Sequence, residues 1–69
     1  MFNGDCLRVL REKQGLTRVK ISKLSGISES TFQRLESGLS VPSIETLVRL
    51  ANTFQLPLKR FMEEVHIIH

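Results

Sequence analysis

With 69 residues, 41% of them hydrophobic and 25% charged, the sequence has room for one globular domain with an economical core. It has no apolar run of membrane-spanning length, no signal-peptide region and one cysteine, Cys6, which favours a reduced cytoplasmic protein without a membrane partner. The net charge is +3, with seven basic and three acidic residues in 1–34 against three basic and four acidic residues in 35–69. A polyanion would be drawn to the N-terminal half.

Glycine and proline divide the chain into pieces of about ten residues, which suits a compact bundle of short helices. We expect a first helix over roughly 5–14, which Gly15 ends in a left-handed conformation. Thr17 is a good N-cap for a second helix over 18–25, after which Gly26 reverses the chain. The inner faces of these two helices are predicted to carry Leu7, Leu10, Ile21 and Leu24.

Three more helices are predicted in the remainder of the chain. Ser28 caps the third and Gly38 stops it, Pro42-Ser43 introduces the fourth, and Pro57 fits the first turn of the fifth. Apolar residues at helical spacing mark the last two: Ile44, Leu47, Leu50, Ala51 and Phe54, then Leu58, Phe61, Met62 and Val65. Strand-like alternation is absent except at the last few residues. The sequence therefore predicts an all-α fold of five short helices.

The third predicted helix has a narrow apolar side and a wide polar face. On a helical wheel, Phe32 and Leu35 define the buried side. The opposite arc carries only polar residues, namely Glu29, Ser30, Gln33, Arg34 and Ser37. Such side chains suit reading of base edges in the DNA major groove, although an ordinary solvated helix face has the same composition.

The second and third helices, joined by a short turn with glycine, predict a helix-turn-helix over about 18–37. About four-fifths of the chain resembles the Cro/repressor-type (Xre-like) helix-turn-helix family. The matching residues, in order and spacing, are Leu10-Arg11, Gly15-Leu16-Thr17, Ile21, Gly26-Ile27-Ser28, Leu35-Glu36, Gly38, Pro42-Ser43, Leu47 and Leu50-Ala51. The resemblance implies one lambda-repressor-like DNA-binding domain over 1–69, with double-stranded DNA as its partner.

The resemblance also implies roles for individual residues. The base-reading positions fall on Glu29, Ser30, Gln33 and Arg34. Arg34 suits a contact to guanine, and Glu29 can accept from a cytosine amino group. Contacts to the DNA backbone are expected from Arg18, Thr17, Lys20, Ser28, Ser37 and Ser40.

One implied pair is structural. In similar proteins the glutamate that matches Glu36 forms a partly buried ion pair with the arginine that matches Arg11. We therefore expect a salt bridge that ties the first helix to the third and orients the recognition helix without touching bases.

The favoured function is a sequence-specific transcriptional regulator, such as a repressor, that acts as a homodimer on a palindromic operator. Dimer contacts are expected in the C-terminal segment 58–69, from Val65, Ile67 and Ile68, while Leu39 and Val41 are either a second apolar contact or core residues. Two alternatives stay open. The chain could be a protein-interaction module on the same fold, or the DNA-binding domain of a longer regulator or enzyme.

Enzymatic and metal-binding functions find little support. The sequence has no glycine-rich phosphate loop, no H-E-x-x-H motif and no Cys/His cluster. His66 and His69 have a spacing that can share a metal ion, but no further ligand is near them in the sequence. We expect no catalytic residue, cofactor, metal or small-molecule ligand.

Overall fold

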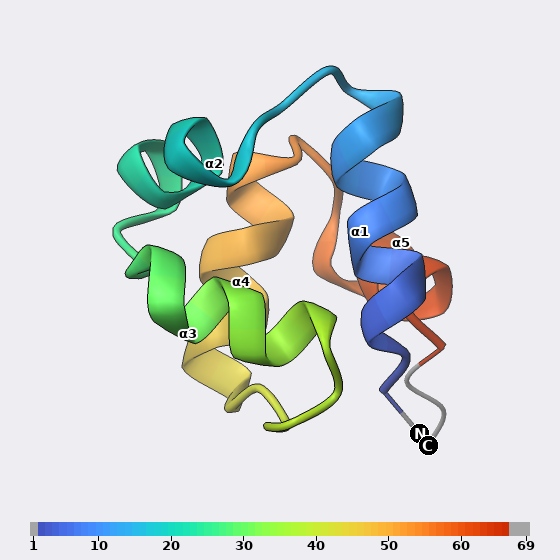
Figure 1. The fold of residues 1–69 in the computed structure, drawn as a ribbon. Helices are drawn as coiled ribbons and strands as arrows, with labels where there is room; N and C mark the ends of the chain where they lie inside the picture. Colours follow the sequence, from blue (N-terminus) through green and yellow to red (C-terminus); the bar gives the residue numbers. More distant parts are fainter. Residues whose placement is uncertain (1, 67–69) are drawn as a thin grey trace.

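The computed structural model describes residues 2–66, which form five α-helices and no strand (Figure 1). The helices are α1 (Gly4–Lys13), α2 (Arg18–Ser25), α3 (Glu29–Glu36), α4 (Ile44–Thr53) and α5 (Leu58–Glu64). The predicted all-α fold is confirmed. None of these helices is long and apolar enough to cross a membrane.

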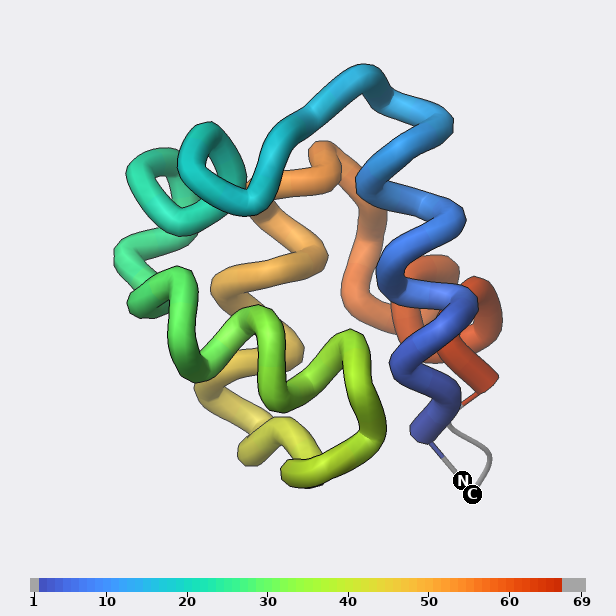
Figure 2. Tube along the Cα trace, viewed as in Figure 1, coloured from blue at the N-terminus to red at the C-terminus, as the bar shows by residue number. Residues whose placement is uncertain are grey.

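The helices surround one core and are arranged so that α2 and α3 form one side of the molecule. Figure 1 shows α1 and α5 on the opposite side, with α4 behind and between the two pairs. The trace in Figure 2 shows how the loop after α1 crosses over to α2. α4 packs against both α2 and α5, and α1 packs against α3 and α5. The backbone N–H of Asn3 donates to the carbonyl of Val65 at 3.0 Å, which ties the start of α1 to the end of α5.

The core consists of buried apolar side chains from all five helices and from the turn before α3. They are Leu7, Leu10, Ile21, Ile27, Phe32, Leu35, Leu47, Leu50, Ala51, Phe54, Phe61 and Val65. Phe54 and Phe61 stack with their ring centroids 5.7 Å apart, which joins the end of α4 to α5.

Two predictions about the core were wrong, and so was one about the dimer contact. Leu24 is 55% exposed because the buried side of α2 centres on Ile21 and Ser25, which leaves Leu24 at its edge. Ile44 is 64% exposed because it lies at the margin of the arc that α4 buries. Val65, expected in a dimer contact, is fully buried in the core of its own chain.

Side chains cap four of the helices at their first turns. Asn3, Thr17, Ser28 and Ser43 each accept a hydrogen bond from a backbone N–H of the helix that they precede. These bonds satisfy donors that have no partner within the helix, so they fix where α1 to α4 begin. Pro57 holds the N-cap position of α5 and not its first turn, which corrects the sequence-based expectation.

Each of the five helices is followed by a residue in the left-handed conformation, with φ of 75° at Gly26 after α2 and 61° at His66 after α5. Gly15 after α1 and Gly38 after α3 have φ of 69° and 80°. Gln55 takes the same role after α4 with φ of 60°. Its N–H donates to the carbonyl of Asn52 at 3.0 Å, and the next N–H, of Leu56, donates to Ala51 at 2.9 Å. A residue with a Cβ is strained in this conformation, which favours glycine.

Replacing Gln55 by glycine is therefore expected to stabilise the protein by about 0.5–1 kcal/mol, because relief of the left-handed strain exceeds the added freedom of the unfolded chain. Urea unfolding monitored by circular dichroism measures the change. Asn52→Gly, inside the last turn of α4, is the matched control and is expected to lose stability. An unchanged or lower midpoint for Gln55→Gly would show that position 55 carries no strain.

Candidate nucleic-acid interface

The turn between α2 and α3 is fixed by local hydrogen bonds. Gly26 ends α2 with φ of 75°, and its N–H donates to the carbonyl of Ser22 at 3.0 Å. The hydroxyl of Ser25 accepts from the N–H of Ile27 at 3.2 Å, and the buried Ile27 side chain anchors the turn in the core. These contacts hold α3 at one angle to α2, as a helix-turn-helix requires.

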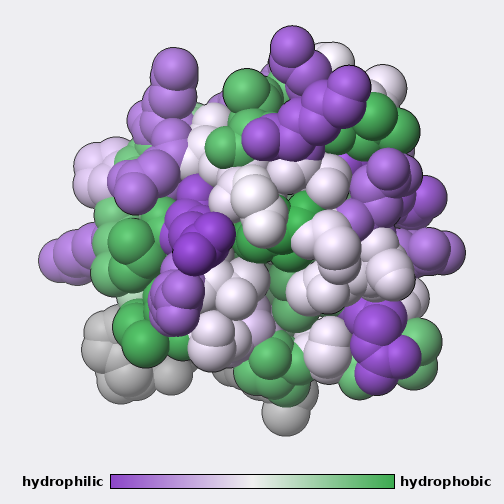
Figure 3. Space-filling model, turned by 90° about the vertical axis from the view of Figure 1, so that its left-hand side faces the viewer, coloured by the Kyte–Doolittle hydropathy of each residue, from purple (hydrophilic) through white to green (hydrophobic). Residues whose placement is uncertain are grey.

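α3 is held by one side and open on the other. Phe32 and Leu35 are 0% and 2% exposed and fasten the helix to the core. The four residues expected to read bases, Glu29, Ser30, Gln33 and Arg34, are all exposed to solvent. Figure 3 views the side formed by α2 and α3 and shows a pale centre of weakly polar surface, bordered by strongly hydrophilic groups. Short polar side chains at the centre of such a face allow close approach of a partner.

Two of the expected base-reading residues share a depression with two expected backbone-contact residues. Glu29 and Gln33 of α3 lie on one side of it, and Thr17 and Arg18 at the start of α2 lie on the other. The end of α1 and the α1–α2 loop complete this open groove. Ser30 and Arg34 lie on α3 outside its lining, as do Lys20, Ser28, Ser37 and Ser40.

Three of the expected backbone-contact hydroxyls already have structural partners. Thr17 accepts from the N–H of Lys20 at 3.1 Å, and Ser28 accepts from the N–H of Thr31 at 3.2 Å. The Ser37 hydroxyl donates to the carbonyl of Arg34 at 3.2 Å, in the last turn of α3. All three residues are nevertheless exposed, so these bonds orient their hydroxyl groups at the surface. Ser40 is half-buried in the loop after α3.

The buried carboxylate of Glu36 joins three helices. Its Oε2 accepts from Nε of Arg11 at 2.7 Å, which is the ion pair expected between α1 and α3. Its Oε1 accepts from Nε of Arg18 at 3.0 Å, a contact that the sequence analysis did not predict. The side chains of Glu36 and Arg11 are 3% and 10% exposed, whereas that of Arg18 is 45% exposed. Arg18 is thus fixed at its inner nitrogen while its outer end faces solvent.

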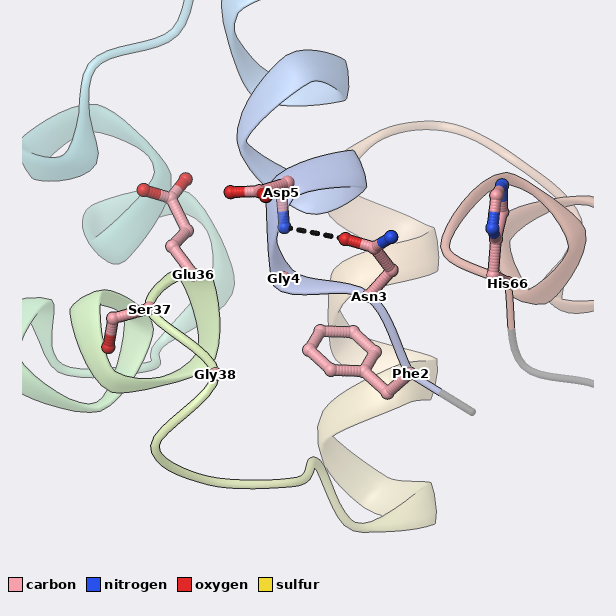
Figure 4. Close-up of a pocket in the computed structure, with 8 residues that line it drawn as sticks. All are labelled: Phe2, Asn3, Gly4, Asp5, Glu36, Ser37, Gly38 and His66. Carbon is pink, nitrogen blue, oxygen red and sulfur yellow. Dashed lines mark hydrogen bonds between the residues drawn. The ribbon is translucent and has the colours of Figure 1, made fainter.

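A close backbone approach also positions α3. Gly4, in the first turn of α1, lies against the last turn of α3 (Figure 4). A Cβ at this position would meet the carbonyl oxygen of Glu36 at 2.5 Å and that of Leu35 more closely still. In the sequence, Gly4 is one of the glycines that divide the chain into helical pieces. No sequence signal separates this glycine from one in a turn, because the neighbour that excludes a Cβ is 31 residues away in the chain.

A family model described as a helix-turn-helix domain matches residues 4–61 of this chain. The chain belongs to this family. The resemblance found in the sequence is confirmed, and the family is not one of enzymes.

Individual relatives agree with this membership. This chain is 36% identical to the HTH-type transcriptional repressor RghR of Bacillus subtilis over 70 residues. The aligned region covers 91% of this chain and 52% of RghR. This chain is 38% identical to an HTH-type transcriptional regulatory protein of Pyrococcus furiosus over 57 residues, covering 83% of this chain and 18% of the relative. The chain thus spans only part of the length of these relatives.

Solved structures share the fold. An HTH_3 family transcriptional regulator from Vibrio cholerae has a TM-score of 0.79 at 28% identity, over 87% of this chain and 34% of that one. A transcriptional regulator from Listeria innocua has a TM-score of 0.75 at 30% identity, over 96% of this chain and 59% of that one.

The unpaired charges of the helix-turn-helix domain are mostly positive. Among residues 2–66, the basic residues without an ion pair are Lys13, Lys20, Lys23, Arg34 and Lys59. Three of these belong to α2 and α3. Glu29 is the one acidic residue of α2 and α3 that has no ion pair within the same range. The helix-turn-helix side therefore presents a positive field with one carboxylate inside it.

The described residues hold no group of three His, Cys, Asp or Glu side chains that is placed to bind a metal ion. His69, Ile67 and Ile68, named in the sequence analysis, lie outside residues 2–66.

Proposed function

We propose that this helix-turn-helix domain is a sequence-specific DNA-binding transcriptional regulator that acts in the cytoplasm as a homodimer on a palindromic operator. The observation that carries the proposal is the geometry of α3. Two buried side chains fix the helix, and its exposed face holds four side chains able to hydrogen-bond to base edges. The named functions of the relatives from Bacillus subtilis and Vibrio cholerae support it.

Specificity would come from α3. Arg34 has five N–H donors, no ion pair among the described residues and a place on the open face, so it can bind guanine O6 and N7. Gln33 can make a bidentate hydrogen bond to adenine N6 and N7. The short hydroxyl side chain of Ser30 can either donate to or accept from a base edge. Glu29 would accept a hydrogen bond from a cytosine amino group and would repel DNA that lacks this donor. It would therefore increase the discrimination between base sequences at the expense of the overall affinity for DNA.

Affinity would come from the backbone of the DNA. Arg18 and Lys20 lie in the first turn of α2, the end of a helix that favours a negatively charged group such as a phosphate. Since Glu36 holds Nε of Arg18, the outer nitrogens of its guanidinium are preorganised for a phosphate. Binding is expected to weaken steeply with salt, because each neutralised phosphate releases counterions.

Glu29 also favours a second candidate function, a protein-interaction module. An exposed acidic side chain without an ion pair among the described residues, on the open face of α3, suits a basic protein surface better than a polyanion. Selection of bound duplexes from a random DNA pool separates the two candidates. Recovery of an inverted repeat supports the proposal, and recovery of no sequence from the pool would favour the protein partner.

We expect Arg34→Ala to cost about 1–3 kcal/mol of binding free energy on the selected operator and to relax one base position. The reason is the loss of a bidentate contact that the wrong base cannot offer. Fluorescence anisotropy on the operator and its single-base variants measures the effect, with Lys59→Ala on α5 as the control. An equal loss on every sequence would instead make Arg34 a phosphate contact.

Arg18→Ala is expected to weaken binding to all sequences alike and to reduce the slope of log K against log salt by about 0.9, the value for one phosphate. Titrations at several salt concentrations give the slope. Arg60→Ala is the control, since Arg60 is an exposed arginine in an ion pair on α5. If the slope of Arg18→Ala equals that of the wild type, Glu36 holds Arg18 for structural reasons only.

A further inference from the structure

One hydroxyl group of α2 reaches across the turn toward α3. The side chain of Ser22 donates to the backbone carbonyl of Ile27 at 2.5 Å. A serine inside a helix usually faces solvent or bonds back to a carbonyl of the preceding turn. The Ser22 hydroxyl instead bonds forward, to a residue that lies beyond the end of its own helix. The bond therefore joins α2 to the segment that leads into α3.

Two serines of α2 hold both polar groups of the Ile27 backbone. The carbonyl accepts from Ser22, and the N–H donates to the hydroxyl of Ser25 at 3.2 Å. Among residues 2–66, neither group has a backbone partner, so the two hydroxyls satisfy groups that otherwise have no partner within the turn. Ile27 is also 8% exposed, with its side chain in the core. This residue is thus held at its side chain, its N–H and its carbonyl.

The orientation of Ile27 sets the start of α3. Ser28 follows it as the N-cap, and the Ser28 hydroxyl accepts from the N–H of Thr31 at 3.2 Å. The carbonyl of Ile27 and the N–H of Ser28 belong to one planar peptide group, so turning that carbonyl re-aims the N-cap. Glu29, the first residue of α3, comes directly after the N-cap. The hydrogen bond from Ser22 therefore controls the direction of the first turn of α3.

The other end of α3 is held by different contacts. Gly4 packs against the carbonyl oxygens of Leu35 and Glu36, and the carboxylate of Glu36 pairs with Arg11. Figure 1 shows this end of α3 beside α1, whereas the first turn lies beside α2 at the left of the molecule. Neither contact of the last turn involves the turn between α2 and α3. The two ends of the recognition helix are therefore positioned by separate groups.

We propose that Ser22 is a positioning residue for base reading by the first turn of α3. It holds the start of the helix so that Glu29 and Ser30 meet their base edges. The contacts of the last turn keep Gln33 and Arg34 in place without it. This inference rests on the proposed DNA-binding function and deepens it. Side chains that bind a partner must be placed to within roughly 0.5 Å, so a small rotation of the first turn is enough to lose its contacts to bases.

The test measures affinity for the operator recovered in the DNA selection and for each of its single-base variants. Glu29→Ala/Ser30→Ala and Arg34→Ala first identify the base pairs that each part of α3 reads. Ser22→Ala removes only a hydroxyl, because alanine is the better helix former and leaves α2 intact. Thr53→Val is the matched control, since it removes a hydroxyl that donates to a backbone carbonyl at 2.8 Å on α4. Circular dichroism checks that every variant is folded.

We expect Ser22→Ala to lower discrimination about tenfold at the base pairs that the first turn of α3 reads, and to leave it unchanged at those that Arg34 reads. The control Thr53→Val is expected to keep the whole profile of the wild type. A change in fold stability alone would not move the preference at some base pairs and spare it at others.

An unchanged profile, or an equal loss at every base pair, would overturn the inference about Ser22. So would a Ser22→Ala variant that no longer folds, because the bond would then serve the fold as a whole, and so would a first turn of α3 that reads no base pair. In each of these cases the wild type still binds its operator, and the proposed function stands. Failure of the wild type to bind any duplex overturns the proposed function and the inference with it.

Discussion

Replacing Glu36 by alanine is expected to lower the free energy of unfolding by about 3–5 kcal/mol, the largest effect of any substitution considered for this chain. The carboxylate is buried and accepts from two arginines. Its removal leaves the guanidinium of Arg11, which is 10% exposed, without a counter-charge inside the protein. Arg18 contributes little to the loss, since its half-exposed side chain can be hydrated instead.

Thermal and urea unfolding of Glu36→Ala measure this loss. Glu45→Ala removes an exposed ion pair with Arg49 and is the control, with an expected change within about 0.5 kcal/mol. A double variant, Arg11→Leu/Glu36→Leu, tests the cause. It leaves no unpaired buried charge and is expected to recover much of the lost stability. If Glu36→Ala loses as little stability as the control Glu45→Ala, the buried ion pair contributes nothing to the stability of the fold.

Gly4→Ala is expected to lower the free energy of unfolding by about 3 kcal/mol, which is at the upper end of the range for overpacked cores. This loss is expected although alanine favours a helix over glycine by about 1 kcal/mol. The added methyl group would meet two backbone carbonyls at the end of α3, those of Leu35 and Glu36. Backbone atoms cannot move aside by a rotamer change, so α1 and α3 must separate.

Gly15→Ala is the comparison for Gly4→Ala, because nothing lies within 4 Å of a Cβ at Gly15 and only its φ of 69° opposes the substitution. That strain is worth about 1 kcal/mol. Urea unfolding ranks the two variants. Since separation of α1 from α3 also shifts the recognition helix, Gly4→Ala should lose operator affinity while Gly15→Ala retains it. A stability of Gly4→Ala equal to or above that of the wild type would contradict the close approach.

The order and type of the helices could be read from the sequence because local chemistry sets them. Thr17, Ser28 and Ser43 cap the helices that they were expected to cap. Gly15 and Gly26 end helices with positive φ, as predicted, and Gly38 ends the third helix as expected. Each of these caps and turns depends on residues at most five apart in the chain, so it can be predicted from the sequence.

The exposed face of α3 was also predictable, since Phe32 and Leu35 define its buried side by spacing alone. The burial of residues at the margins of the helices could not be predicted. Leu24 and Ile44 have the right spacing for a core position, yet both are exposed because the neighbouring helices cover narrower arcs. Val65 follows the last turn of α5 and is buried where the chain folds back on α1.

The sequence by itself therefore determined five short helices, their boundaries to within a residue or two, and which face of α3 is open. The resemblance to a known family supplied the Arg11–Glu36 pair, but the tertiary structure alone decided the other contacts that fix that face in space: Glu36 also paired with Arg18, and Gly4 packed against the end of α3. The physical reason is distance along the chain. Caps and turns depend on neighbours a few residues away, whereas a buried charge or an excluded Cβ depends on groups brought together only when all the helices pack.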